Sequence, residues 1–222
     1  MTTRTPPARI PPSVRRRALS PVLLYGRSRG LPVAFAALAV TLLVTAWAEP
    51  RLVREHGVVD PANRLPLTLL APVVAAAVVG TGLHTPSAEL DRAAARPWWW
   101  PRLLHVAGAT GLAAAGLALA LTGSPDVYGS PAAIRNLLGG VGLTLLTAVV
   151  AGAGPSWLPT ALYSAVAYFV LIPADEAHTG AAGVWGWAVQ PGPQTGAWAT
   201  AVTLFATGTA AWALLGSRRR DG

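Results

Sequence analysis

The chain has 222 residues, of which 53% are hydrophobic and only 12% are charged. A water-soluble domain of this length needs more charge to cover its surface, so the composition excludes an ordinary soluble protein and favours an all-α membrane protein. The net charge of +8 comes from 17 arginines, since the sequence has no lysine. Ten of these arginines lie before the first or after the last apolar stretch, which indicates membrane topology signals and argues against nucleic acid as a partner.

The residue types also exclude several kinds of chemistry. Without lysine there is no Walker A phosphate loop, and without cysteine there is no thiol nucleophile or cysteine metal site. The four histidines do not stand at metal-ligand spacing from one another; they are His56, His84, His105 and His178. Asp175, Glu176 and His178 either form a solvated loop cluster or hold an external cation. We therefore expect a protein that is not an enzyme and has no catalytic residue, metal or cofactor in this chain.

Residues 1–30 are expected to form a cytoplasmic tail rich in arginine and proline, followed by an amphipathic helix on the membrane surface. Apolar residues recur at helical spacing on the face opposite the arginines, at Val14, Ala18, Val22 and Tyr25. Such a helix binds the lipid bilayer through its apolar face, although Pro21 bends or shortens it. A short basic tail over residues 217–222 is expected at the other end of the chain.

Between these tails, residues 31–216 are predicted to form a domain of six transmembrane helices. A bilayer core of about 30 Å needs about 20 apolar residues in a helix, and six stretches approach that length. They are Leu31–Ala48, Leu65–Leu83, Leu103–Thr122, Leu137–Ala153, Trp157–Ile172 and Gly196–Gly216. The fourth helix is expected to start earlier, with Ser130 as its N-cap and Pro131 at the first helical position. Its separation from the fifth depends on Gly152, Gly154, Pro155 and Pro159.

Arginine positions predict the orientation of this domain. Seven arginines precede the first span, and Arg218, Arg219 and Arg220 follow the last. Because cytoplasmic segments are enriched in basic residues, both termini are predicted to lie in the cytoplasm, at the plasma (inner) membrane. The segment Ala174–Thr195 contains no arginine and is predicted to lie outside. The first outer loop is mixed, with three basic and three acidic residues.

The loop between the second and third spans is predicted to carry a short helix over Ser87–Arg96. Thr85 and Pro86 form a helix start, acidic Glu89 and Asp91 lie early, and Pro97 ends the segment. Three tryptophans then precede Pro101, in an arrangement typical of a membrane anchor. The helix is either a simple connector or a docking element for a cytoplasmic partner.

Ionisable residues inside predicted spans are few. Arg135 and Asn136 lie about one turn into the fourth helix if that helix starts at Pro131. Two interpretations remain open: Arg135 reaches out to the membrane interface, or the pair lines a polar pathway. Pairs of small residues four apart, namely Ala109/Ala113, Gly111/Ala115 and Ala206/Ala210, predict close helix contacts. Most of the nine tryptophans lie near predicted span ends, which favours interfacial anchoring.

The layout resembles the membrane subunit of an ABC-2-type transporter, the permease half of an ABC exporter. A cytoplasmic amphipathic segment (Val14–Gly30) precedes the first span like that family's elbow helix, and six spans follow with both termini inside. The sequence "TPSAELDRAAARP" lies where such permeases carry a coupling helix, and the segment Pro173–Thr195 lies where they place short re-entrant helices. The segment "ELDRAAARPWWWPRLLH" is also similar to loops of small actinobacterial-type permeases of this kind.

The resemblance implies a permease subunit driven by a separate cytoplasmic ATPase. Glu89, Leu90, Asp91 and Arg92 would transmit the nucleotide-driven movement, and the chain would form a homodimer or pair with a second permease. The alternative is a non-transport integral membrane subunit, such as an assembly, immunity or signalling partner in a larger complex. The sparse polarity inside the spans supports that alternative.

Overall fold

The computed structural model describes residues 31–56, 61–82, 99–123, 128–171 and 182–216. All regular structure in these ranges is helical. The elements in chain order are α2 (Leu31–His56), α3 (Pro61–Thr81), α5 (Trp99–Ala120), α6 (Ser130–Ala151), α7 (Leu158–Val166), the π-helical turn η2 (Ala167–Leu171), α8 (Ala182–Trp185), the 3₁₀ turn η3 (Trp187–Val189) and α9 (Thr195–Leu215).

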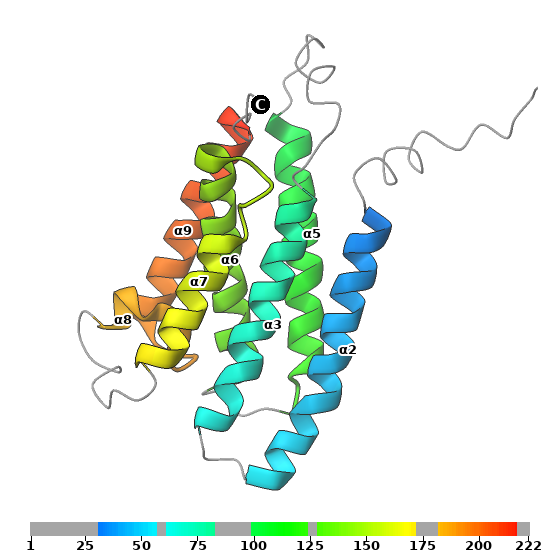
Figure 1. Cartoon of the computed structure of the whole chain (residues 1–222), viewed down its shortest axis with the longest axis vertical. Helices are drawn as coiled ribbons and strands as arrows, with labels where there is room; N and C mark the ends of the chain where they lie inside the picture. The colour runs from blue at the N-terminus through cyan, green and yellow to red at the C-terminus, as the bar shows by residue number, and fades with distance from the viewer. Residues whose placement is uncertain (1–30, 57–60, 83–98, 124–127, 172–181, 217–222) are drawn as a thin grey trace, which may run out of the picture.

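The long helices alternate in direction and form one antiparallel bundle (Figure 1). The first residue of α2 and the last residue of α9 lie at the same end, which we call the terminal end. The opposite end carries α8, and we call it the cap end. The connection from α6 turns back along the bundle before α7 begins, so α7 occupies mainly the half nearer the cap end (Figure 1).

Within the described residues, four helices are long and apolar enough to cross a membrane. These candidate spans are Pro32–Arg51, Trp99–Ala120, Ser130–Ala151 and Thr195–Leu215. The apolar parts of α3 and α7 are shorter, at Leu67–Thr81 and Leu158–Val170. Large apolar side chains such as Val33, Leu119 and Leu214 point outward with about three quarters of their surface exposed. That outer surface suits lipid and indicates an all-helical membrane protein; the crossing of all six stretches stays a prediction.

Helix α6 is the centre of the bundle. In its apolar stretch 61% of the residues are buried, against 17–22% in the other three candidate spans. It packs most extensively on α9, where two glycines remove the side chains that would separate the helices. A Cβ atom at Gly142 would overlap the backbone at Leu204 and Phe205, and one at Gly208 would overlap the Gly142 carbonyl. The two backbones therefore touch directly, as small residues permit between membrane helices.

Several helix ends differ from those predicted. Helix α6 begins at Ser130, but Gly129 is its N-cap. The Ser130 hydroxyl instead donates to the carbonyls of Ala118 and Leu121, at 3.3 Å each, and so ties the start of α6 to the end of α5. Helix α2 continues through Pro50 to His56, beyond the predicted end at Ala48. The predicted break after α6 is confirmed, because the helix ends at Ala151 and Gly152 follows with a φ of +90°.

Some predictions fall outside the described residues and stay predictions. They include the amphipathic helix of residues 1–30 and the basic tail of residues 217–222. They also include the loop helix Ser87–Arg96, with its proposed coupling residues Glu89, Leu90, Asp91 and Arg92. The possible cation cluster of Asp175, Glu176 and His178 is among them as well.

Candidate functional site

Residues 182–194, which we call the cap segment, are irregular backbone packed into the end of a helical bundle. Only α8 and η3 are helical in it, with four and three residues. Pro191 and Pro193 lack the backbone N–H that a continuing helix requires. Trp187, Ala188, Val189 and Gln190 are nevertheless at most 5% exposed. Buried backbone of this kind is tolerated in a membrane protein only if its carbonyls find hydrogen-bond donors.

Two adjacent residues of α6 supply most of these donors. The guanidinium of Arg135 donates to the carbonyls of Pro191 and Gln190, both at 2.7 Å. The Nδ2 of Asn136 donates to the carbonyl of Ala188 at 2.7 Å and to that of Thr68 in α3 at 2.9 Å. The Asn136 Oδ1 accepts two bonds from Arg135 at 3.2 Å. Arg135 and Asn136 therefore act as one unit that joins α3, α6 and the cap segment.

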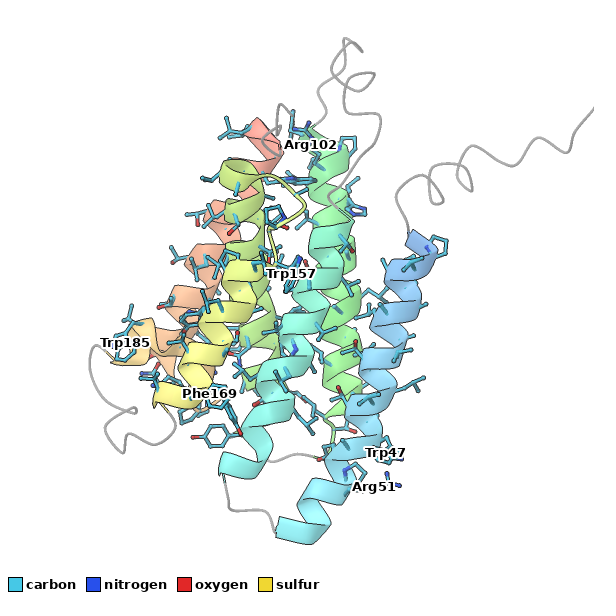
Figure 2. The ribbon with its side chains drawn as sticks, in the orientation of Figure 1. Trp47, Arg51, Arg102, Trp157, Phe169 and Trp185 are labelled. Carbon is cyan, nitrogen blue, oxygen red and sulfur yellow. The ribbon has the colours of Figure 1, made fainter. Side chains whose placement is uncertain are left out.

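Aromatic residues of α7 and α9 hold the two ends of the cap segment. The Tyr163 hydroxyl donates to the carbonyl of Trp185 at 2.8 Å, and its ring stacks on Trp187 with centroids 5.3 Å apart. The indole N–H of Trp198 donates to the carbonyl of Gly192 at 2.7 Å. Figure 2 shows Trp185 at the outer edge of the cap end. Side chains of α6, α7 and α9 thus replace the hydrogen bonds that a helix would have made internally.

The cap segment also sets the start of α9 and the face of α6 below it. Gln194 is the N-cap of α9, and its Oε1 accepts a hydrogen bond from the Ala197 N–H at 2.6 Å. Trp187 lies against Gly139, where a Cβ atom would overlap the indole ring. The segment is therefore positioned by hydrogen bonds along its length and by a ring that needs a glycine opposite it.

The Arg135 side chain does not extend out of the bundle, because its exposed fraction is 0%. Within the described part of the chain, its hydrogen-bond acceptors are neutral carbonyl or amide oxygens. Burial raises the pKa of Tyr128, just before α6, and the Arg135 guanidinium only partly opposes that shift. Tyr128 therefore stays neutral at physiological pH and does not balance the charge. A buried guanidinium is stable only while such acceptors stay in place, which couples Arg135 to the cap segment's position.

The terminal end has a simpler contact between α5 and α9. Arg102 in the first turn of α5 donates to the carbonyl of Ala213 at 3.2 Å and lies 5.8 Å from the Trp212 ring centroid. Figure 2 shows Arg102 at this end. A cation beside the last carbonyls of a helix is favourable because of the helix dipole. Arg102 therefore stabilises the end of α9, next to Gly216 with its φ of +72°.

The site contains residues that the sequence did not single out. Arg135 and Asn136 were predicted as polar residues inside the bundle, and they do lie together on buried backbone; a role in a pathway stays a prediction. Tyr163 and Trp198 were not predicted. A tryptophan near a span end, such as Trp198, is equally typical of a membrane anchor, and a tyrosine within a span shows no partner in the sequence. No group of three or more His, Cys, Asp or Glu in the described ranges could hold a metal. The geometry positions backbone and offers no nucleophile–base pair among its named members.

Of the three predicted small-residue pairs, only Ala109/Ala113 lies at a helix contact: Ala113 is fully buried in the core and Ala109 packs against it. Gly111, Ala115, Ala206 and Ala210 are exposed on the outer surface of the bundle. The close approach is made by Gly142 with Gly208 instead. A run of three glycines in four positions, Gly139, Gly140 and Gly142, was the signal in the sequence that could have identified this face.

Comparison with known proteins identifies no relative for this chain. No family model matches it, and neither a curated protein nor a solved structure matches it.

Proposed function

We propose that the chain is the permease subunit of an ATP-binding-cassette exporter in the plasma membrane. In this proposal all six apolar stretches cross the bilayer and both termini lie in the cytoplasm. A separate ATPase subunit drives the movement, and a second copy or a similar permease completes the pathway. The transported substrate is left open by this proposal.

The observation that supports it is the cap segment. Two short helices, α8 and η3, lie between η2 and α9 and pack into the end of the bundle. The resembled family places short re-entrant helices in that position, at the end opposite both termini. Here α2 begins and α9 ends at the terminal end, opposite α8 (Figure 1). The Arg135–Asn136 unit gives this arrangement a physical basis, because it supplies donors that irregular backbone needs inside a membrane.

The helical part of the fifth crossing is short, because α7 has nine residues and η2 has five. A helix of that length is shorter than the roughly 30 Å hydrocarbon core. The connection 152–157 completes the passage on the side of the terminal end, and its Ser156 is fully buried. In this proposal α7, η2 and this connection together make the fifth crossing, with Gly152 and Ser156 buried and Gly154 and Trp157 exposed.

One observation favours the alternative, a non-transport integral membrane subunit. Arg135 and Asn136 are both engaged in holding the cap segment, and α6 is packed against α3, α5, α7, α9 and η3. The described part of a single bundle therefore offers no polar pathway along α6. Under the transporter proposal, the pathway lies between two permease subunits.

Topology reporters test the six crossings. We expect reporters placed after Gly222 and within Arg96–Arg102 to be cytoplasmic, and one near Gly180 to be external. The physical reason is the arginine distribution, because basic residues are retained on the cytoplasmic side. An external reporter after Gly222 would contradict the six-span arrangement.

Reversal of two loop charges separates the transporter from its alternative. Replacing Glu89 and Asp91 by arginine should weaken binding of the ATPase subunit or uncouple hydrolysis from transport. Exposed helix charges usually change stability by only about 0.5 kcal/mol or less, so folding and insertion should persist. Pull-down of the ATPase and vesicle transport, measured on folded protein, give the readouts. Unchanged binding and transport would remove the coupling role, and a purified complex with a single membrane subunit would favour the alternative.

A further inference from the structure

A groove of about 240 Å³ lies between α2, α3 and α5. Its floor is formed by Leu38, Ala75 and Val79, which are at most 7% exposed. Its rim includes Phe35, Leu104 and Leu112, which are 53%, 58% and 49% exposed. Among the described residues that line it, His105 alone has a polar side chain. We call this apolar hollow the α2 groove.

The α2 groove exists because α2 and α5 are close at one level and apart at another. Leu42 of α2 packs on Gly116 of α5, where a Cβ atom would overlap the leucine side chain. Two turns earlier on α5, at Gly108, no atom of another described helix lies within 4 Å of the place a Cβ would occupy. Figure 1 shows α2 leaning away from α5 toward the terminal end. Gly108 therefore lies at an unfilled opening on the outer surface of the bundle.

The position of the opening identifies what surrounds it. Both α2 and α5 are long and apolar enough to cross a membrane, and the rim residues are on their outward faces. Trp99 and Trp100 are exposed in the first turn of α5, at the depth that interfacial tryptophans prefer. Gly108 is eight residues further along the helix, which is about 12 Å at 1.5 Å per residue. The opening therefore lies at the depth of lipid acyl chains.

An apolar hollow at that depth does not stay empty. Water gains no polar partners there except near His105, and unfilled space loses dispersion contacts along its whole lining. The neighbouring molecules that can fill it are lipids, whose chains are flexible and apolar. We propose that the α2 groove binds one acyl chain of a membrane phospholipid, with the headgroup on the side of His105 and the terminal end. This site is independent of any ATPase partner.

Two glycines of α5 provide a matched test. Gly108 lines the groove and Gly111 does not, although both are exposed and both have open space around the missing Cβ. Gly108→Phe places a ring in the opening, whereas Gly111→Phe adds the same ring to the outer surface. Gly108→Leu serves as a second, smaller blocking variant. Neither position forces a clash, so both variants should fold.

The probe is a phosphatidylcholine with a photoactivatable diazirine in its acyl chain, added to the full chain in mild detergent. We expect saturable labelling of the wild-type protein, mapped by mass spectrometry to the α2 and α5 peptides that line the groove. Gly108→Phe and Gly108→Leu should weaken this binding about tenfold, while Gly111→Phe should leave it unchanged. Non-saturable labelling of the wild type would overturn the proposal. Equal labelling of the Gly108 and Gly111 variants, each shown to be monodisperse and helical, would also overturn it.

Discussion

The cap end and the α2 groove are two regions of one bundle that differ in packing, because the first is filled and the second is hollow. At the cap end, side-chain donors satisfy the irregular backbone, and midway along the bundle α6 and α9 touch through Gly142 and Gly208. At the α2 groove, Gly108 leaves space that no side chain of the described helices fills. The same residue type therefore closes the α6–α9 contact and opens the groove. The difference depends on whether a neighbouring helix reaches the glycine.

The largest expected effect is the loss of Arg135. In Arg135→Met, the carbonyls of Gln190 and Pro191 lose their donors while the apolar stem is kept. Each buried unsatisfied group costs about 1–3 kcal/mol, so the free energy of unfolding should fall by about 2–4 kcal/mol. Thermal unfolding in detergent measures the change. The control is Arg51→Met, which alters an exposed arginine that contacts the carbonyl and the ring of Trp47 and should change stability by about 0.5 kcal/mol or less.

Equal stability of Arg135→Met and the wild type would mean that the cap segment does not depend on this arginine. Arg135→Lys sharpens the result, because a single ammonium cannot reproduce the planar fork that meets two carbonyls and the Asn136 amide. We therefore expect the lysine variant to fall between the methionine variant and the wild type.

A smaller effect should follow when a methyl group is placed between α6 and α9. In Gly142→Ala, the added Cβ overlaps the backbone of Leu204 and Phe205. The helices α6 and α9 must therefore move apart to accommodate it. Overpacking of this kind typically costs about 1–3 kcal/mol. Gly111→Ala is the matched control, because its Cβ meets open space. That variant should be stabilised by up to about 1 kcal/mol through its higher helix propensity.

The sign of these two changes is the decisive observation, since both replace a glycine by alanine inside a helix. Chemical or thermal unfolding of both variants under the same conditions measures the sign of each stability change. If Gly142→Ala were as stable as Gly111→Ala, the direct contact between the α6 and α9 backbones would be contradicted.

The smallest effect concerns one hydroxyl at the cap end. Tyr163→Phe keeps the ring stacked on Trp187 and removes the hydroxyl that donates to the Trp185 carbonyl. Hydrogen bonds within membrane bundles contribute about 0.6 kcal/mol on average, so a loss of about 0.5–1.5 kcal/mol is expected. Faster hydrogen exchange at α8 should accompany it. Unchanged exchange would indicate that the stacked ring alone holds Trp185 in place.

Much of the fold was predictable because length and apolarity act locally. Each of the six predicted stretches overlaps a helix in the structure, and the break at Gly152 was predicted from glycine and proline. Arg135 and Asn136 could be selected because a polar pair within an apolar stretch is conspicuous. Their partners could not, because the carbonyls of Ala188, Gln190 and Pro191 lie more than fifty positions away in the chain.

By itself, the sequence determined that this chain forms apolar helices, where they break, and which polar side chains lie inside them. Those properties follow from local hydrophobicity and from the backbone limits of glycine and proline. Tertiary structure alone decided that Arg135 is buried within the bundle, and that Gly142 makes a helix contact while Gly111 faces outward. Such outcomes depend on what lies opposite a residue in space, and apolar helices of similar composition carry little information about which neighbour that is.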